Sequence, residues 1–261
     1  MFEYNAIATR IIGLAPYTFF AMIGIVFAAS TFFLLLLKYD YHIPRYSKIF
    51  LISGVGMLAG AVLFGSLSGL YNALANDNPI DIYTFLNGGI VFYGGMLGFI
   101  FSFMLICKIM DKFVDFALVD LAVICIPLFH MWGRLGCFFA GCCFGAETDS
   151  LFSVLYTNHT LGEVVTASRI PIQLVEAFAN LIIFVSLLIL RSKPVFAGYI
   201  LPIYLTIYAA LRLNLEFFRG DAARGVWNGV SFGQTVSVII IICVFYLVLR
   251  RGLKERECGN I

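Results

Sequence analysis

The stretch FALVDLAVICIPLFHMWGRLGCFFAGCCFG, residues 116–145, starts as a long apolar run and ends in a segment rich in glycine and cysteine. Its first part, residues 116–133, is long enough to cross the ~30 Å hydrocarbon core of a bilayer as a helix. Arg134 stands directly at the end of this run. A charge in such a place is costly unless it faces the protein interior or binds a ligand. The stretch therefore predicts a membrane helix that ends at a polar site.

The rest of the 261-residue chain has the composition of an integral membrane protein. Hydrophobic residues make up 61% and charged residues only 12%, whereas a soluble domain averages about 25% charged residues. The apolar runs long enough to span a bilayer cover residues 16–37, 49–71, 88–107, 116–133, 172–190, 195–215 and 230–249. We expect one polytopic domain over residues 1–261, all-α, with seven transmembrane helices.

The loops between these runs sort by charge. One side receives every lysine and five arginines: Lys38, Arg45, Lys48, Lys108, Lys112, Arg191, Lys193, Arg250, Arg251, Lys254 and Arg256. The other side receives only arginines: Arg10, Arg134, Arg169, Arg212, Arg219 and Arg224. The positive-inside rule then predicts an N-terminus outside and a C-terminus in the cytoplasm. Outer arginines can grip phosphate with their planar fork, or simply reach toward lipid headgroups as anchors.

The first polar motif on the outer side is IVFYGGMLGF, residues 90–99. It places Gly94 and Gly95 directly after Tyr93. Small residues let a neighbouring helix approach closely. The same smooth surface can admit a lipid headgroup beside Tyr93, so both interpretations stay open.

The segment after the fourth run is the second motif. Gly133, Gly136, Gly141 and Gly145 favour irregular backbone, which is tolerated at membrane depth only where it is buried in protein or lines a wet cavity. We expect this backbone to bring Arg134 against an anion.

Three cysteines of the same segment allow three interpretations. Cys137, Cys142 and Cys143 can fill a packed turn as small apolar residues, form a disulfide on the oxidising side, or act as metal ligands or reactive thiols. Metal is the least favoured, because no fourth ligand stands nearby at a familiar spacing and His130 lacks a second histidine. We therefore predict no metal site.

RIPIQLVEA, residues 169–177, opens the fifth run. Pro171 suits the first turn of a helix, and Gln173 and Glu176 share one helix face because they are three residues apart. A carboxylate inside a span marks either a site or an ion pair that orders the bundle. Glu176 is open to both interpretations.

LRLNLEFFRGDAARG, residues 211–225, ends the sixth run with a high density of charge. Its charged residues are Arg212, Glu216, Arg219, Asp221 and Arg224. The first three are predicted to lie along one helical strip. So many charges beside a membrane are costly unless they pair with one another or with a ligand.

SFGQTVS, residues 231–237, opens the last run with the polar side chain of Gln234. By the count of spans, all of these polar segments fall at the outer end. We expect the outer segments 134–170 and 216–229 to line one cavity that holds several arginines. The natural ligand of such a cavity is a phospholipid headgroup.

In chain order, these motifs resemble the bacterial prolipoprotein diacylglyceryl transferase family. The matching blocks are YGG, GRLGxF, R-x-P-x-Q-L-x-E, E-F-F-R-G-D-x-x-R-G and G-Q-x-x-S, between about residues 90 and 237. Each block is weak by itself. The ordered set, together with the seven-span topology, is fairly specific.

The resemblance implies a reaction, the first step of lipoprotein maturation. The family moves the diacylglyceryl group of phosphatidylglycerol to the lipobox cysteine of a secreted prolipoprotein, so that a thioether forms and glycerol 1-phosphate leaves. A thiol with a reference pKa of ~8.5 is partly ionised near neutrality and is a good nucleophile. Arginines aimed at the departing phosphate lower the barrier. The reaction as implied needs no metal or soluble cofactor.

The resemblance also implies roles for residues. It makes Arg134 and Arg219 a catalytic clamp on the phosphate, with Tyr93 at the position before the paired glycines. The implied substrate-binding residues are Gly94, Gly95, Gly133, Gly136, Gly145, Gln173, Glu176, Glu216, Asp221, Arg224 and Gln234.

The chain departs from the family pattern at four polar positions. Tyr93 stands where the family has histidine, Cys137 where it has asparagine, and Cys142 where it has glutamate. Val62 follows Gly60–Ala61 in the second run, where an arginine is usual. A tyrosine with pKa ~10 is a poor general base at neutral pH. A second class of function therefore stays open: a non-catalytic lipid-binding or thiol-redox membrane protein on the same fold.

The expected partners are phosphatidylglycerol, a prolipoprotein signal peptide with its lipobox cysteine, and the lipid bilayer, with no nucleic acid among them. The expected location is the bacterial plasma (inner) membrane, crossed several times, with the active site toward the outer face. A transporter would instead be expected to show broken helices and symmetric halves, and no sequence repeat is evident.

Overall fold

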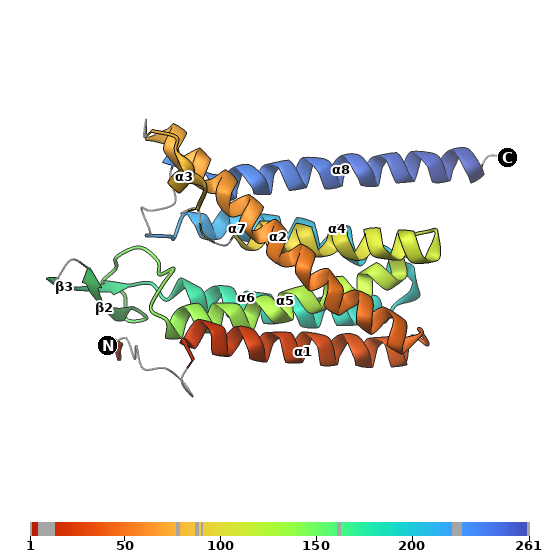
Figure 1. Cartoon of the computed structure of the whole chain (residues 1–261), viewed down its shortest axis with the longest axis horizontal. Coiled ribbons are helices and arrows are strands. Elements are labelled where there is room, and N and C mark those ends of the chain that lie inside the picture. The colour runs from red at the N-terminus through yellow and green to blue at the C-terminus, as the bar shows by residue number, and fades with distance from the viewer. Residues whose placement is uncertain are drawn as a thin grey trace.

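The computed structural model describes residues 2–4, 14–76, 79–86, 89, 91–160, 163–220 and 226–259. Within these ranges the chain is mainly a bundle of long helices, and α2 crosses the others obliquely (Figure 1). The helices are α1 (Pro16–Lys38), α2 (Ile43–Ala75), α3 (Ile82–Leu86), α4 (Phe92–Asp111), α5 (Phe116–Phe139), α6 (Ile172–Arg191), α7 (Ile200–Glu216) and α8 (Phe232–Gly259), with a 3-10 turn at Pro194–Phe196.

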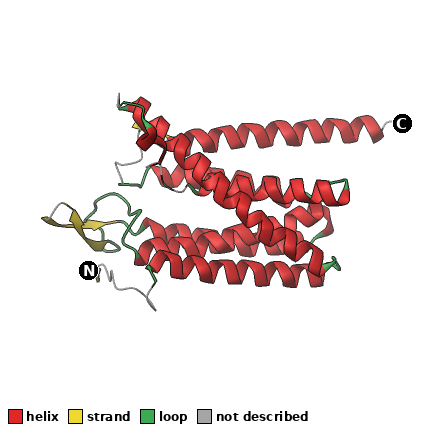
Figure 2. Cartoon of the chain, in the orientation of Figure 1, coloured by secondary structure: helices red, strands yellow, loops and turns green. Residues whose placement is uncertain are grey.

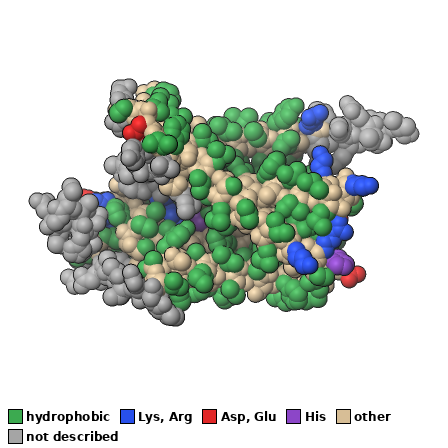
Figure 3. Space-filling model, in the orientation of Figure 1, with side chains coloured by type: hydrophobic (Ala, Val, Ile, Leu, Met, Phe, Trp, Pro, Cys, Tyr) green, Lys and Arg blue, Asp and Glu red, His purple; other side chains and the backbone are tan. Residues whose placement is uncertain are grey.

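Six helices of the described ranges are long and apolar enough to cross a bilayer: α1, α2, α4, α5, α6 and α8. Large hydrophobic side chains are exposed on their outward faces and cover the length of the bundle in Figure 3. This is the surface that lipid requires, so the prediction of a multi-pass membrane protein is confirmed. The seventh apolar run, 195–215, folds as α7, which has only 17 residues. Seven spans and the orientation of the termini remain predictions.

The central helix of the bundle is α5. Nearly every side chain from Leu118 to Leu128 is buried, and α1 and α6 pack along it. The helix begins at Asp115, whose side chain accepts a hydrogen bond from the Ala117 backbone N–H at 2.8 Å. Because α5 is surrounded by protein, polar groups at its far end are held away from lipid.

A seam of glycines joins α2 to α4. A Cβ atom added at Gly98 would lie 3.1 Å from the Cα of Gly60, and one added at Gly94 would meet the backbone of Gly60. The two helices therefore touch backbone to backbone, as small residues permit in membrane proteins. This contact fixes the start of α4, where Tyr93 lies.

Short strands lie beyond the helix ends at one side of the bundle (Figure 2). β1 (Phe2–Tyr4) pairs in parallel with β2 (Val154–Thr160), and β2 pairs antiparallel with β3 (Glu163–Arg169). A second pair joins β4 (Val226–Trp227) to β5 (Val230–Ser231). The all-α prediction therefore holds for the membrane part but missed these sheets. The strands are short and, except for β5 at the edge of the last run, lie outside the apolar runs, where hydrophobic periodicity carries little signal.

The opposite end of the bundle collects most of the Lys and Arg side chains visible in Figure 3. Here the turns between α1 and α2, α4 and α5, and α6 and α7 meet. Arg45 forms an ion pair with Asp111. The Tyr41 hydroxyl donates to Asp115 at 2.7 Å, and burial together with this carboxylate raises the pKa of Tyr41. The polar site lies at the other end.

Candidate active site

A buried network of charges has Glu176 of α6 at its centre. Arg134, near the end of α5, donates from Nη2 to Glu176 Oε2. Arg212 of α7 places Nη1 3.8 Å from Glu176 Oε1. Both arginines are 7% exposed and Glu176 is 1% exposed. Because a buried charge without a partner is strongly destabilising, this one carboxylate holds two arginines and three helices together.

The network continues along α7. Arg212 Nη2 lies 2.8 Å from Glu216 Oε2, one turn further on, as the spacing predicted. The start of α8 approaches this pair, since a Cβ atom added at Gly233 would lie 3.5 Å from Arg212 Nη2 and Glu216 Oε2. The resulting order is arginine, glutamate, arginine, glutamate across α5, α6 and α7. Glu176 and Glu216, both predicted binding residues, belong to it.

Three residues that the sequence motifs did not place in the site support Glu176. His130 puts Nε2 3.9 Å from Glu176 Oε1, and its ring stacks on Phe92 at a centroid distance of 3.6 Å. Asn180 donates from Nδ2 to the Glu176 backbone oxygen at 2.8 Å. The sequence reasoning assigned His130 no partner. Its position four residues before Arg134 was the available signal, since that spacing puts both side chains on one helix face.

The backbone of Arg219 belongs to a set of hydrogen-bonded segments at the same end of the bundle. A three-segment clasp joins the chain before α6 to the chain after α7, and it consists of residues 145–147, 168–170 and 218–220. Its bonds are Gly145 N–H to Ile170 O at 2.9 Å, Ile170 N–H to Ala146 O at 3.1 Å, and Ala146 N–H to Phe218 O at 2.9 Å. Gly145 and Arg219 form an antiparallel bridge. Because α7 ends at Glu216, the prediction that Arg219 continues its helical strip is wrong.

Arg219 nevertheless acts electrostatically on Glu176, as do Arg134 and Arg212. The clasp also explains two glycines. A Cβ atom at Gly145 would lie 2.8 Å from the Ile170 backbone oxygen, and one at Gly220 would lie 2.8 Å from the Cα of Ala146. The backbones approach too closely for any side chain at these positions.

Gln173, at the start of α6, ties the loop after α5 to the sheet. Its Nε2 donates to the backbone oxygen of Cys142 at 2.6 Å, and the Tyr156 hydroxyl of β2 donates to its Oε1 at 3.3 Å. The side chain is fully buried. The structure therefore places this predicted binding residue between the loop after α5 and β2, on the same helix as Glu176.

Tyr93 is buried in the first turn of α4. Its hydroxyl is 2.5 Å from Ser237 Oγ of α8, and its ring meets the edge of Tyr208 at a centroid distance of 5.2 Å. Arg212, Glu176 and Glu216 lie within electrostatic range of it. The neighbouring Gly94 and Gly95 face α2, which supports helix packing at these positions.

The remaining predicted residues of the described ranges are Gly133, Gly136 and Gln234. Gly136 packs on α1, because a Cβ atom added there would lie 3.1 Å from the Cα of Tyr17. A Cβ atom added at Gly133 would meet nothing within 4 Å. Gln234 caps α8, because its Oε1 accepts the Ser231 backbone N–H at 2.9 Å. Asp221 and Arg224 lie outside the described residues.

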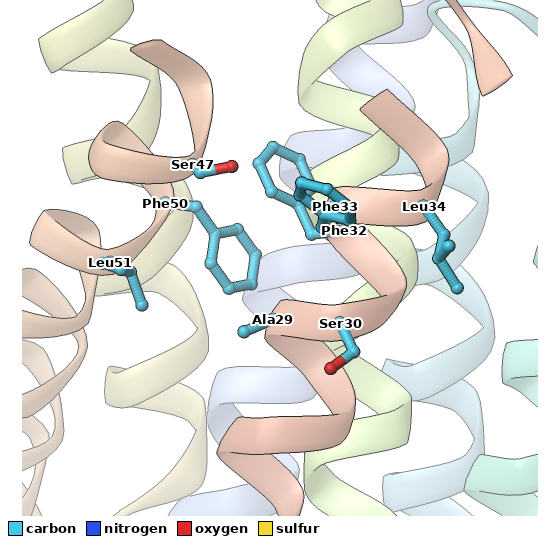
Figure 4. A pocket seen from close by; sticks show the side chains of 8 residues that line it. All are labelled: Ala29, Ser30, Phe32, Phe33, Leu34, Ser47, Phe50 and Leu51. Carbon is cyan, nitrogen blue, oxygen red and sulfur yellow. The ribbon is translucent and has the colours of Figure 1, made fainter. Parts of the chain in front are cut away.

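A cavity of about 410 Å³ lies between α1 and α2 (Figure 4). Phe32, Phe33 and Phe50 are among the apolar side chains that line it. None of its lining residues belongs to the charge network. This apolar groove is therefore not the arginine-lined cavity expected from the sequence, and that cavity stays a prediction.

The three cysteines lie together where α5 ends. Their sulfur atoms are all within 4.8 Å of one another. Cys137 and Cys142 are free thiols, so the structure contradicts the disulfide interpretation for this pair. The pKa of Cys142 is raised by hydrogen bonding to the neighbouring sulfurs of Cys137 and Cys143 and by burial.

Comparison with known proteins adds an independent result. The family described as prolipoprotein diacylglyceryl transferase matches residues 6–250. A Clostridium tetani protein named phosphatidylglycerol–prolipoprotein diacylglyceryl transferase is 30% identical over 252 residues, covering 94% of this chain and 98% of that protein. A Clostridium perfringens protein with the same name and the number 2 is 29% identical over 256 residues, covering 95% and 96%. A Rickettsia canadensis protein of that name is 31% identical over 207 residues, covering 77% of each.

Proposed function

The chain belongs to the prolipoprotein diacylglyceryl transferase family, and from this premise we propose that it transfers the diacylglyceryl group of phosphatidylglycerol to the cysteine thiol of a prolipoprotein. It is a transferase of the bacterial plasma membrane, built on several membrane-crossing helices. The site assignment rests on one observation, the buried network around Glu176 at one end of the bundle.

The charges of this network favour an anionic ligand. Arg134, Arg212 and Arg219 contribute three positive charges, and Glu176 and Glu216 contribute two negative ones. Three minus two leaves one positive charge, and the phosphodiester of phosphatidylglycerol carries one negative charge. Because a guanidinium has five N–H donors, an arginine paired with one carboxylate retains donors for phosphate oxygens. Arg134 and Arg219 therefore serve as the phosphate clamp.

The reaction places charge where the arginines lie. The thiolate sulfur of the acceptor attacks the diacylglycerol carbon that carries the phosphate, and the C–S bond forms as the C–O bond between this carbon and the phosphate oxygen breaks. The electron pair leaves with the phosphate oxygen, so the phosphate group goes from one negative charge to two. The proton of the thiol goes to solvent. Preorganised guanidinium donors stabilise this growing charge, and Glu176 holds them in position.

Tyr93 acts in this scheme as a hydrogen-bonding residue of the site wall. Its hydroxyl contacts Ser237, and its phenol is too weak a base to deprotonate a thiol at neutral pH. Gln173, Gly133 and Gly145 shape the backbone around the headgroup, and Gly94 and Gly95 hold Tyr93 in place through their contact with α2.

The finer topology is part of the same proposal. α7 is the seventh span, short because its last turn carries the charges of the site. The N-terminus and the active site face outward, and the C-terminus lies in the cytoplasm. This arrangement is supported by the lysines, which gather at the end of the bundle opposite the charge network. The outer segments 134–170 and 216–229 then form the rim of the site.

A transfer assay tests the proposal. The purified protein is mixed with phosphatidylglycerol vesicles and a lipobox peptide, alongside Arg134→Ala and the control Arg45→Ala, which removes an arginine of an ion pair at the other end. We expect the peptide to gain the mass of a diacylglyceryl group and glycerol phosphate to be released, with loss of both in Arg134→Ala only. A well-folded protein that binds the lipid and transfers nothing would contradict the proposal and support a lipid-binding protein.

A further inference from the structure

The cluster of Cys137, Cys142 and Cys143 is a group of nucleophilic and metal-ligating side chains that the transfer scheme leaves unused. Their three sulfur atoms lie within 4.8 Å of one another. Sulfur atoms bound to one tetrahedral Zn²⁺, each at ~2.3 Å, lie about 3.8 Å apart. The upper limit of the observed spacing is therefore about 1 Å longer than in that geometry.

The backbone at the end of α5 brings these sulfurs together. Gly141 has φ +67°, its N–H donates to Phe138 O at 3.0 Å, and the Cys142 N–H donates to Cys137 O at 3.1 Å. This pair of bonds is the Schellman arrangement, which folds the chain back over the last helical turn. Cys142 therefore returns to Cys137, in a position where such turns commonly make a hydrophobic contact.

Two further contacts hold the turn in this shape. Gln173 donates to the Cys142 backbone oxygen at 2.6 Å, which fastens the turn to α6. Cys143 has φ +60°, an uncommon conformation for a residue with a side chain, and it directs the third sulfur to the same side. The cluster is thus built into the fold before any ligand arrives.

The surrounding charge suits three thiolates around a divalent cation. Three thiolates and one Zn²⁺ carry a net charge of −1. The network of Arg134, Arg212 and Arg219 with two glutamates carries +1, and Arg134 Nη1 lies 3.8 Å from Cys137 Sγ. Binding of the metal releases the thiol protons, and the Arg134 guanidinium beside Cys137 offsets part of the resulting negative charge.

We propose that Cys137, Cys142 and Cys143 bind Zn²⁺ as thiolates and that the acceptor thiol of the prolipoprotein occupies its fourth coordination position. The second part rests on the proposed function. Soft sulfur ligands select thiophilic metals over Mg²⁺ and Ca²⁺, and a Zn²⁺ site with three protein ligands keeps one position open for water or substrate. Cys137 is buried and Cys142 is exposed, so the cluster can be reached from the surface.

This proposal replaces the sequence-based prediction of no metal site. The metal site was not predicted because the sequence offers no fourth protein ligand nearby, and in this proposal the acceptor thiol of the substrate is the fourth ligand. It also accounts for the thiol activation that Tyr93 cannot provide. Zn²⁺ deprotonates a coordinated thiol, and the proton goes to solvent.

The remaining step balances without a redox partner. The zinc-bound sulfur of the acceptor attacks the diacylglycerol carbon that carries the phosphate, and the C–S bond forms. The electron pair of the broken C–O bond leaves with the phosphate that faces Arg134. The neutral thioether is a weaker ligand than the thiolate and is replaced on the metal by water. The metal keeps its oxidation state throughout.

The metal site is tested by its stoichiometry. The purified full chain is incubated with ZnCl₂, excess metal is removed, and bound zinc is counted by mass spectrometry for the wild type, Cys142→Ser, Cys143→Ser and the control Cys243→Ser. We expect about one tightly held Zn²⁺ in the wild type and the control, and at least a tenfold loss of affinity in the other two. No bound zinc in the wild type, or equal binding in all four proteins, would overturn the site. Thermal unfolding of each variant verifies that the fold is intact.

The acceptor role is tested with Co²⁺ in place of Zn²⁺. Addition of a lipobox peptide should shift the absorption bands of the bound Co²⁺, and a peptide with serine in place of cysteine should not. Transfer at an unchanged rate by zinc-stripped protein would overturn the acceptor role and leave the proposed function standing. If neither the zinc-stripped nor the zinc-loaded protein transferred the diacylglyceryl group, the proposed function would be overturned instead. The zinc stoichiometry would still test the metal site by itself.

Discussion

The two ends of α7 each meet a buried carboxylate from another helix. At its start, Asp120 of α5 accepts the backbone N–H groups of Gly198 and Leu201. Near its end, Glu176 of α6 receives the guanidinium groups of Arg134 and Arg212. Both carboxylates are almost completely buried, at 0% and 1% exposure. They differ in the donors that neighbour them: backbone N–H groups for Asp120 and guanidinium groups for Glu176.

We propose that this difference separates a structural carboxylate, Asp120, from one that serves the reaction, Glu176. A backbone N–H group donates one hydrogen bond, and for Gly198 and Leu201 that bond goes to Asp120. A carboxylate at the start of a helix is also stabilised by the helix dipole. A guanidinium has five donors, so Arg134 and Arg212 can hold Glu176 and still bind an anion. The first arrangement is complete in itself, whereas the second has spare donors. The substitutions below test this contrast, from the largest expected effect to the smallest.

Replacement of Glu176 by alanine has the largest expected effect. It leaves two buried arginines without their shared carboxylate, which destabilises the fold by about 3–5 kcal/mol. The transfer rate is expected to fall by about 10²-fold or more because the phosphate clamp loses its position. Unfolding in denaturant and the transfer assay measure the two quantities. If neither changed, Glu176 would not be the centre of the network.

Arg134→Lys separates binding chemistry from stability. Lysine keeps the positive charge but lacks the planar fork, so transfer is expected to fall by about 10²–10³-fold. Unfolding free energy is expected to change by no more than about 1 kcal/mol, because the charge still faces Glu176. Steady-state kinetics and thermal unfolding of the same samples distinguish the effects. A near-normal rate would show that a point charge suffices.

Asp120→Asn tests the structural end of α7. Asparagine keeps one acceptor oxygen, but its amide NH2 group is a donor and would leave one of the two backbone N–H groups without an acceptor. We therefore expect destabilisation of about 1–3 kcal/mol. The folded protein should transfer at the wild-type rate, since Asp120 lies at the end opposite the charge network. Unfolding and transfer rate are measured below the melting temperature. A rate loss in fully folded protein would mean that Asp120 also serves the reaction.

Arg45→Ala has the smallest expected effect. It breaks the ion pair with Asp111, and the Arg45 side chain of this pair is 35% exposed. Pairs of this kind contribute about 0–1 kcal/mol, and transfer should not change. Thermal unfolding and the transfer assay serve again. A large loss of activity here would show that arginine removal anywhere disturbs the protein, and would weaken the interpretation of Arg134→Lys.

Local spacing predicted one part of the site well. Arg212 and Glu216 pair as their separation of four residues required, and Gln173 and Glu176 are both buried on the inner face of α6. The partner of Glu176 was beyond this reasoning, because Arg134 lies on a different helix. The same holds for His130, whose contact with Glu176 joins α5 to α6.

Other features depended on segments far apart in the chain. The clasp joins the loops before α6 and after α7, and β2 pairs with both β1 and β3. The cysteines are an intermediate case. Their proximity follows from a local turn around Gly141, yet the anchor of that turn, Gln173, comes from α6.

Composition and hydropathy alone established that this chain crosses a membrane, because lipid admits only long apolar helices with internally bonded backbones. The ordered motifs alone pointed to the transferase family. Tertiary structure decided which charges are used, since the cost of a buried charge depends on its neighbours in space. It paired Arg134 with Glu176, placed Asp120 at the start of α7, and anchored the cysteine turn to Gln173 of α6. Periodicity records which face of a helix is apolar, but carries no record of which helix lies opposite.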